Sequence, residues 1–264
     1  MVRLSVVRYL NTTPLVYAFQ KGRITHDFEL TYDVPSECAR KLKAGEANVG
    51  IIPSIEYARS ISPYRIVPDI SISSNGPVGS IFLFHRIPVD QITTVALDTS
   101  SRTSVALTHV ILKDKYGVDI TPLPHPPDLD AMLADADAAL VIGDPALEYT
   151  ERQEDRLDLG REWTEMTGLP FVYAFWAGHE GAMTPAAVRK LIEARNTGLT
   201  SLEEIAAEYA EKHLHTPAFY ESYLRDHLQF PFGPDEQAGV REFYHRAYRL
   251  GLIDSEPVLQ FYNI

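Results

Sequence analysis

The sequence has a single cysteine, Cys38, among 264 residues. One thiol forms no internal disulfide, and it excludes zinc or iron–sulfur sites built from several cysteines. Long apolar runs are also missing, because no segment approaches the ~20 residues of a membrane span. Arg3 and Arg8 interrupt what would be the apolar part of a secretory signal. We therefore expect a cytoplasmic protein that has no membrane partner.

Basic residues are scarce relative to acidic ones, with 24 Lys and Arg against 36 Asp and Glu, so the formal net charge is −12. Nucleic acids and anionic membranes bind dense basic surfaces, and the charge argues against both as partners. It leaves a small anionic ligand open. The oligomeric state is not indicated by the sequence.

Several catalytic motifs are absent. There is no glycine-rich dinucleotide loop, phosphate-binding loop with lysine, His-Glu-x-x-His motif or Gly-x-Ser-x-Gly elbow, and the nine histidines lie in no recognisable triad. We expect no metal and no cofactor. Ligand binding remains, or a lyase that works through hydrogen bonds.

Short apolar segments that alternate with helical patterns fill the first part of the chain. Predicted strands are Leu4–Val7, Phe28–Val34 and Val49–Ile52, and predicted helices are Leu15–Lys21 and Glu37–Ala44. This alternation predicts a mainly parallel sheet, with ligand-binding loops at the carboxyl ends of its strands.

A second unit of the same kind follows. Val95–Leu97 and Ala138–Ile142 are expected strands, Thr103–Lys115 is an expected helix, and Pro122–Pro127 is too rich in proline for regular structure. The pattern from residue 184 onward predicts a helical tail. Thr184-Pro185 and Thr216-Pro217 each place a capping hydroxyl before a proline of the first turn, and Thr200–Glu203 has the pattern of a capping box. We predict two α/β lobes with a ligand cleft between them: lobe I of residues 1–86 and 178–264, and an inserted lobe II of residues 87–177.

The segment Leu97–Ser104 carries the strongest local signal for a binding site. A strand ends there, a helix begins, and five of the six residues from Thr99 to Ser104 bear hydroxyls. Free N–H groups at a helix start, together with hydroxyls, form an anion site. The alternative is an ordinary serine-rich helix cap. The candidate ligands of a carboxylate are Ser100, Ser101, Arg102, Thr103 and Ser104.

Other polar residues follow predicted strands, where the site loops of an α/β protein lie. The candidates are Asn11, Thr12, Ser36, Ser54, Ser80, Gly143 and Asp144. Each has an alternative reading as a turn residue or a helix cap. Tyr173 and Trp176 could wall the cleft, although core packing would equally explain two aromatic side chains in an apolar strand.

Taken together, five stretches resemble the chorismate dehydratases of the futalosine route to menaquinone. They are Arg8–Leu15, Val34–Ser36 with Gly45 and Val49–Ser54, Leu97–Val105, Ala139–Ala146 and Leu159–Val172. The resemblance implies the two-lobe fold of type II periplasmic solute-binding proteins. A sister family, the 1,4-dihydroxy-6-naphthoate synthases, is similar in fold but has Ile-His-Glu where Ile142-Gly143-Asp144 stands here.

The resemblance implies that chorismate, a dianion, loses water to give 3-[(1-carboxyvinyl)oxy]benzoate. The hydroxyls of the Leu97–Ser104 segment would hold one carboxylate, and Asn11, Ser36, Ser54 and Ser80 would hold the ring and the leaving hydroxyl. The base is either Asp144 or the enolpyruvyl carboxylate of the substrate itself, because a lone carboxylate beside a dianion is repelled. The sister reaction and a non-catalytic carboxylate-binding protein remain as alternatives.

Overall fold

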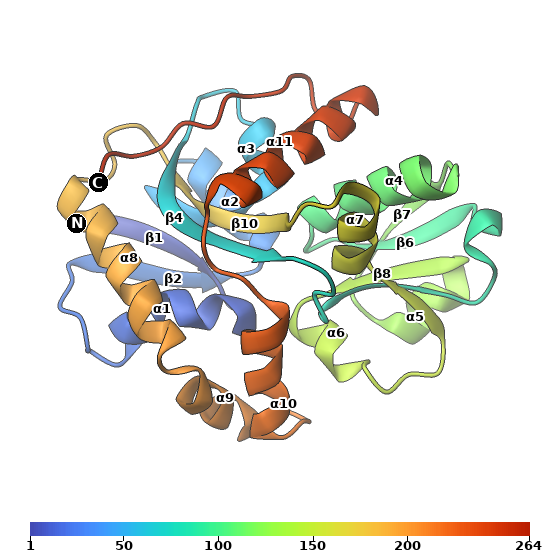
Figure 1. The fold of residues 1–264 in the computed structure, drawn as a ribbon, viewed down its shortest axis with the longest axis horizontal. Coiled ribbons are helices and arrows are strands. Elements are labelled where there is room, and N and C mark those ends of the chain that lie inside the picture. Colours follow the sequence, from blue (N-terminus) through green and yellow to red (C-terminus); the bar gives the residue numbers. More distant parts are fainter.

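The computed structural model describes all residues, 1–264, as two lobes, each built on a five-stranded sheet (Figure 1). The first sheet has the order β2–β1–β3–β10–β4, and the second has the order β7–β6–β8–β5–β9. The strands of the first sheet are β1 (Val2–Val7), β2 (Phe28–Asp33), β3 (Val49–Pro53), β4 (Arg65–Ser74) and β10 (Phe171–Gly178). Those of the second are β5 (Ile81–His85), β6 (Thr94–Asp98), β7 (Thr121–His125), β8 (Ala138–Ile142) and β9 (Asp155–Asp158).

Helices cover both sheets. The first lobe carries the short 3-10 turn η1 (Leu10–Thr12), α1 (Thr13–Gln20), α2 (Pro35–Lys43) and α3 (Ser54–Ala58). The second carries η2 (Val89–Gln91), α4 (Thr103–Tyr116), α5 (Leu129–Asp135), α6 (Asp144–Glu148) and α7 (Leu159–Thr167). The C-terminal part supplies α8 (Pro185–Leu199), α9 (Leu202–Ala210), α10 (Pro217–Ser222), the π-helical turn η3 (Tyr223–His227) and α11 (Pro234–Arg249). No helix is long and apolar enough to cross a membrane.

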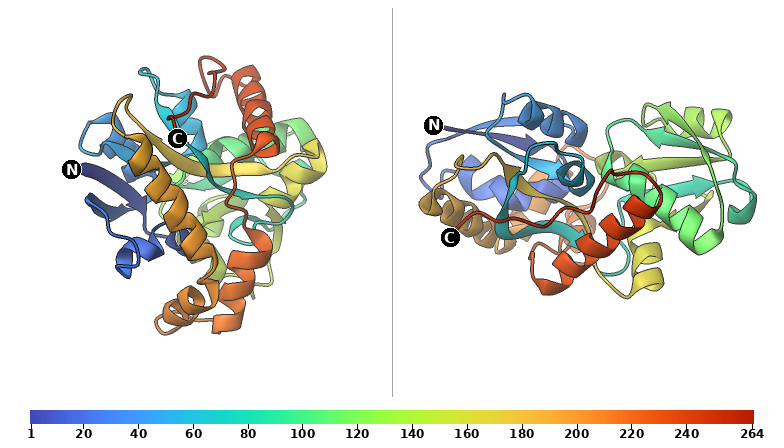
Figure 2. Two further views of the ribbon diagram at one scale, coloured as in Figure 1. Left: turned by 60° about the vertical axis from the view of Figure 1, so that its left-hand side comes forward. Right: turned by 90° about the horizontal axis from the view of Figure 1, so that it is seen from above.

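The C-terminal helices mostly return to the first lobe. Helix α8 packs on α1, whereas α11 lies across the junction of the lobes and contacts both β10 and α4 (Figure 2). The tail is therefore part of the packing between the lobes rather than a separate unit.

Both sheets are mixed, which corrects the expectation of mainly parallel sheets. Three strands in each sheet are parallel, β2–β1–β3 and β7–β6–β8. Strand β10 runs antiparallel to β3 and β4, and β5 runs antiparallel to β8 and β9. The physical reason is that β5 and β10 are reached from the other lobe, so no helical crossover within one sheet forces them to be parallel.

The chain crosses between the lobes at residues 75–80 and 159–170. Strand β5 belongs to the second sheet and β10 to the first, so the expected boundaries at 86/87 and 177/178 each misplace one strand. Both strands are buried along almost their whole length and uniformly apolar. Such a pattern reveals a strand but not the sheet it joins.

Two smaller expectations were also wrong. Thr121–His125 forms strand β7 despite its prolines; β7 is an edge strand, where a missing N–H need not interrupt a ladder on both sides. The predicted capping box at Thr200–Glu203 does not form, because the hydroxyls of Thr200 and Ser201 donate to the Thr197 carbonyl at the end of α8. Thr184 and Thr216 cap α8 and α10 as predicted.

One carboxylate, Asp158, ties the two crossings together. It accepts the N–H groups of Val78 and Gly79 at 3.0 and 2.8 Å, from the first crossing. It also caps α7 by accepting from Gly160 and Arg161 at 3.0 and 3.1 Å, in the second crossing. Four N–H bonds to one side chain fix the two connections relative to each other.

Candidate functional site

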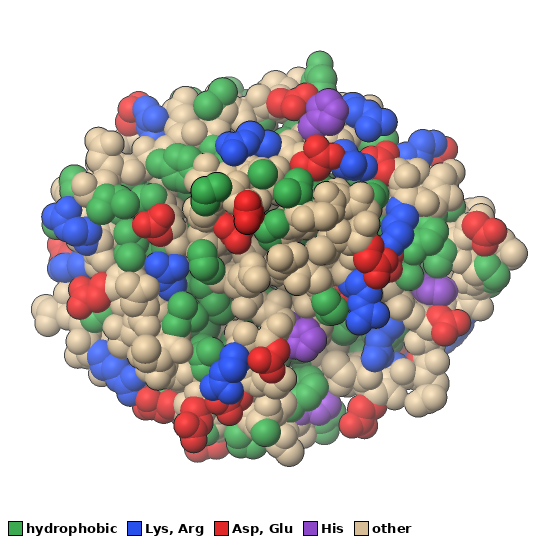
Figure 3. All heavy atoms as spheres, viewed as in Figure 1, with side chains coloured by type: hydrophobic (Ala, Val, Ile, Leu, Met, Phe, Trp, Pro, Cys, Tyr) green, Lys and Arg blue, Asp and Glu red, His purple; other side chains and the backbone are tan.

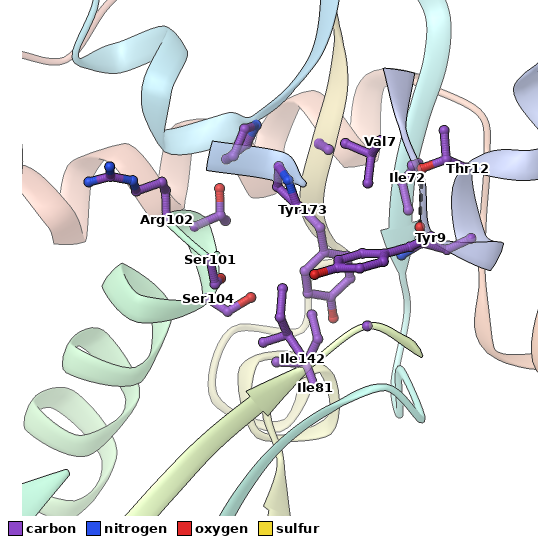
Figure 4. Close-up of a pocket in the computed structure, with 16 residues that line it drawn as sticks. Val7, Tyr9, Thr12, Ile72, Ile81, Ser101, Arg102, Ser104, Ile142 and Tyr173 are labelled. Atoms are coloured by element: carbon purple, nitrogen blue, oxygen red, sulfur yellow. Dashed lines mark hydrogen bonds between the residues drawn. The ribbon is translucent and has the colours of Figure 1, made fainter. Parts of the chain in front are cut away.

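A cavity lies between the lobes, at the carboxyl ends of the parallel strands. It encloses about 500 Å³ of empty space, its open mouth included. A cleft between lobes is a preferred place for a small-molecule site. We call this one the interlobe cavity. Its lining residues are Val7, Tyr9, Asn11, Thr12, Pro35, Pro53, Ile72, Ile81, Ser101, Arg102, Thr103, Ser104, Ile142, Gly143, Tyr173 and Ala174 (Figure 4).

The start of helix α4 forms one polar end of this cavity. Ser101, Thr103 and Ser104 line it and are buried. No side chain caps the helix, so the N–H groups of its first turn remain available to a ligand. In Figure 4 the Ser101 and Ser104 side chains lie toward the centre of the cavity. Hydroxyls and helix N–H groups of this kind suit a carboxylate.

Arg102 behaves differently from the expectation that it completes the anion cage. It lines the cavity, but its side chain is exposed and extends away from Tyr9 and Tyr173 (Figure 4). Ser101 and Ser104 are three residues apart and share one face of the helix start, whereas Arg102 lies on another. The polar end is therefore formed by neutral donors.

The first lobe contributes the opposite wall, which consists of Tyr9, Asn11 and Thr12. The Thr12 hydroxyl donates to Oδ1 of Asn11 at 3.2 Å, which leaves the Asn11 amide N–H₂ group as a donor. The Tyr9 hydroxyl lies 3.2 Å from Oγ of Ser100, across the gap between the lobes. Burial raises the pKa of the Tyr9 phenol, which keeps it protonated and able to donate.

The rest of the lining is apolar, except for one further hydroxyl. The hydroxyl of Tyr173, on β10, lies 2.8 Å from Oγ of Ser74. Burial raises the pKa of this phenol well above its ordinary value. Aliphatic side chains surround it, among them Ile72, Ile81 and Ile142. This surface excludes water and accommodates the face of a ring.

Gly143 allows the two lobes to approach closely. Its φ is +66°, and a Cβ at this position would lie 2.7 Å from two ring atoms of Tyr9. Only glycine tolerates both the backbone conformation and the contact. The glycine expected to contact a ligand thus also packs against a tyrosine of the other lobe.

Asp144, one of the two candidates for the base, does not line the interlobe cavity. Both of its oxygens accept the N–H of Leu10, at 2.9 and 3.2 Å. Helix α6 begins at Asp144, and this geometry turns the carboxylate back toward the first lobe. Burial raises the pKa of its carboxyl group. The contact fastens one lobe to the other.

Five further candidates lie beside the cavity rather than in its lining. The Ser36 N–H donates to the Ser100 carbonyl at 3.2 Å, and Oγ of Ser100 donates to Asp98 at 2.7 Å. Oγ of Ser54 donates to the Val172 carbonyl at 2.8 Å, and Oγ of Ser80 accepts from Tyr223 at 2.8 Å. Trp176 is fully buried in the core. The hydroxyls of Ser54, Ser80 and Ser100 are thus already engaged by the protein.

The sequence analysis missed Tyr9 and the apolar lining. Tyr9 lies in the loop after the first strand, as Asn11 does. The same argument that selected Asn11 could therefore have selected Tyr9. The sequence holds no comparable signal for the aliphatic lining residues Ile72, Ile81, Ile142 and Ala174. An aliphatic residue in a strand has the same sequence pattern whether it contacts a ligand or the core.

The chemistry available here is limited. Besides exposed Arg102, the ionisable lining residues are Tyr9 and Tyr173, whose pKa values are raised. No group of three His, Cys, Asp or Glu side chains that could hold a metal ion occurs. The cavity can bind and align a molecule through neutral donors, and a base at neutral pH would have to come from the ligand.

Two lobes joined by two crossings, with a cavity between them, define a periplasmic-binding-protein-like fold. A protein of Archaeoglobus fulgidus has a TM-score of 0.78 at 19% identity, covering 96% of this chain and 98% of its own. The periplasmic aliphatic sulphonate binding protein of Escherichia coli has a TM-score of 0.68 at 16% identity, covering 100% and 94%. The predicted fold class is confirmed.

The sequence comparison identifies the family. A family model described as menaquinone biosynthesis matches residues 2–249, and the chain belongs to this family. A chorismate dehydratase of Thermus thermophilus is 32% identical over 94% of this chain and 95% of its own. A chorismate dehydratase of Campylobacter jejuni is 30% identical over 64% of this chain and 63% of its own. The resemblance seen in the sequence is confirmed.

Proposed function

We propose that this protein is a chorismate dehydratase, which eliminates water from chorismate to give 3-[(1-carboxyvinyl)oxy]benzoate. The observation that carries the proposal is a cavity of neutral donors with an uncapped helix start at one end and no side-chain base. The relationship to two chorismate dehydratases supports the same reaction. Aromatisation of the ring drives the elimination, so neither a metal nor a cofactor is required.

In this proposal the polar end at α4 holds one carboxylate of the substrate. Ser101, Thr103 and Ser104 donate to it together with the N–H groups of the helix. The ring lies over the aliphatic surface, and the opposite wall supplies the Asn11 amide and the Tyr9 phenol as possible donors to the departing hydroxyl. Donors aimed at the ring carboxylate stabilise the charge that spreads into it as the ring proton leaves.

The substrate supplies its own base in this mechanism. The enolpyruvyl carboxylate accepts the ring proton, and the electrons of the broken C–H bond complete the aromatic system as the C–O bond to the hydroxyl breaks. The resulting carboxyl group passes the proton to the departing hydroxyl, which leaves as water. The engagement of Asp144 by Leu10 supports this choice, since a carboxylate held outside the cavity cannot reach the proton. The protein contributes alignment and the exclusion of water.

The proposal includes a cytoplasmic location, which the unpaired, buried thiol of Cys38 favours. The partner is a small dianionic substrate.

Incubation of the purified protein with chorismate, followed by chromatography and mass spectrometry, tests the proposal. We expect an aromatic product lighter than chorismate by one water. A protein that binds chorismate tightly without converting it would be a binding protein instead. Conversion of the cyclic futalosine substrate, but not of chorismate, would assign the sister reaction.

A replacement of Asp144 separates the two possible bases. We expect Asp144→Asn to keep near-normal turnover, because the amide oxygen still accepts the Leu10 N–H. Asp144→Ala removes that acceptor, so the two lobes lose a contact between them. We expect turnover to fall by about 10-fold as a result. A loss above about 10³-fold in Asp144→Asn would instead make this carboxylate the base.

A further inference from the structure

A second cavity opens beside the crossings, and the proposed dehydration does not use it. It contains about 1030 Å³ of empty space, including its open side. Its walls come from the first crossing, from β5 and β9, from the end of α6 and the start of α7, and from α10 with η3. We call it the outer cavity. Tyr223 borders it and donates to Ser80, so the outer cavity is built on the contact between the C-terminal helices and the second lobe.

Two arginines, Arg156 and Arg161, line the outer cavity without a carboxylate partner. The Arg156 guanidinium donates to the carbonyls of Tyr149 and Thr150 at 3.2 and 2.8 Å and lies 5.0 Å from the centre of the Phe82 ring. It is therefore held in one orientation. Arg161 is exposed at the start of α7 and forms no ion pair. A fixed guanidinium beside a free one is a geometry that suits an oxyanion.

The outer cavity is lined by two arginines and one carboxylate, so the formal charge of its lining is positive. Asp158 is the acidic side chain in the lining, and its oxygens already accept four backbone N–H groups. Nδ1 of His227 lies 3.2 Å from the Pro77 carbonyl, which makes it the donor and leaves Nε2 for another partner. The charge that faces the cavity is therefore positive, within a protein whose formal net charge is −12.

The remaining lining residues indicate what the non-anionic part of a ligand would be. Half-buried Phe219 provides aromatic surface, whereas Phe82 is buried beneath Arg156. The hydroxyls of Thr150 and Ser222 also line the cavity and donate to Leu147 and Asp226. A free inorganic ion would leave the aromatic surface uncovered. A small organic molecule with an apolar body and an anionic group would cover it and meet the guanidinium groups at the same time.

We propose that the outer cavity is a second binding site, for a small organic oxyanion with an apolar body. The shared chemistry is a carboxylate or a phosphate ester that bridges Arg156 and Arg161. Because the walls come from both lobes, a bound molecule contacts the second lobe and the C-terminal helices together. The site is independent of the dehydratase reaction.

Isothermal titration calorimetry at fixed ionic strength tests the site with three probes: benzoate, phenyl phosphate and the neutral benzyl alcohol. We expect at least one anion to bind and benzyl alcohol not to bind. Arg156→Gln and Arg161→Gln should each weaken the anion by about 10-fold, the loss expected for one charged hydrogen-bonding partner. Preference between benzoate and phenyl phosphate identifies the anionic group.

Two matched variants complete the experiment. Arg189→Gln removes an exposed arginine of α8 outside the cavity and should leave binding unchanged. Ser104→Ala alters the interlobe cavity and should leave the binding that depends on Arg156 and Arg161 unchanged. Binding that falls in Ser104→Ala but not in the arginine variants would place the probes between the lobes and overturn the proposal, as would no binding of either anion. If Arg156→Gln fails to fold, Arg161→Gln decides alone.

Discussion

Neutral donors, rather than charged side chains, form the polar end of the interlobe cavity. Ser101, Thr103 and Ser104 combine with the uncapped start of α4, while Arg102 extends outward. The proposed dianion would be held by oriented dipoles in a site largely closed to water, where each is stronger than at the surface. This arrangement also explains why Asp144, a buried carboxylate, is kept outside the lining by Leu10.

Gly143 should be sensitive to the smallest substitution. We expect Gly143→Ala to lower the free energy of unfolding by about 2–4 kcal/mol and turnover by more than 10-fold, because the new Cβ meets the Tyr9 ring at 2.7 Å and φ is +66°. Urea denaturation and a turnover assay measure both effects.

Gly117→Ala is the matched control for this substitution. Gly117 has φ +72° but no atom within 4 Å of its would-be Cβ, so it should lose only about 1 kcal/mol and keep full turnover. Equal losses at the two positions would show that backbone strain, and not the contact between the lobes, matters at Gly143.

At the scale of elements, single carboxylates join separate segments of the chain through several hydrogen bonds each. Asp158 joins the two crossings, and Asp137 joins β6 to β8 where both strands begin. Oδ2 of Asp137 accepts the backbone N–H and the hydroxyl of Thr93 and of Thr94, at 2.8 to 2.9 Å. These bonds, led by that of the Thr93 N–H, lower the pKa of Asp137 to about 2.

Asp137 should stabilise the fold in a pH-dependent manner. A carboxyl whose pKa is lower in the folded than in the unfolded state stabilises above the unfolded value, near pH 4, and loses this effect as the pH falls toward about 2. We expect Asp137→Asn to cost about 1 kcal/mol at pH 7, because partial exposure weakens the effect, about the same at pH 5, and less at pH 3.

Urea denaturation at the three pH values measures this dependence, with exposed Asp254→Asn as the control that should change little at any of them. A cost for Asp137→Asn that is constant across the pH range would show that the charge of the carboxylate is not what the threonines stabilise.

The elements themselves were largely predictable. Helix α4, strand β8 and the threonine caps of α8 and α10 follow from local patterns of apolar periodicity and capping. Strand β7 was not predictable, since its prolines are tolerated only because the sheet ends there. The same limit applies to β5 and β10, whose apolar sequences suit either sheet.

At the scale of the whole molecule, charge of both signs is spread over the surface. On the face shown in Figure 3, acidic and basic side chains are interspersed, and many form exposed ion pairs such as Arg23–Glu204 and Arg152–Asp130. The excess of 12 negative charges nevertheless repels a dianion approaching from solution.

The rate of substrate capture should therefore rise with salt. Screening shortens the range of the repulsion from ~30 Å at 0.01 M to ~8 Å at 0.15 M ionic strength. We expect kcat/KM for chorismate to increase about two- to five-fold over this range, through KM, measured with a salt of weakly binding ions. A steep decrease would mean that a local basic region, such as the outer cavity or Arg102, attracts the substrate.

The sequence by itself determined the composition-level facts and most of the elements: the acidic charge, the two α/β units, the hydroxyl-rich start of α4 and the family. These depend on residues near one another in the chain. Only the tertiary structure decided which lobe receives β5 and β10, that Gly143 meets Tyr9, and that Asp144 contacts Leu10. Each of these depends on residues more than 80 positions apart, or on which sheet a strand joins, and no local pattern encodes such contacts.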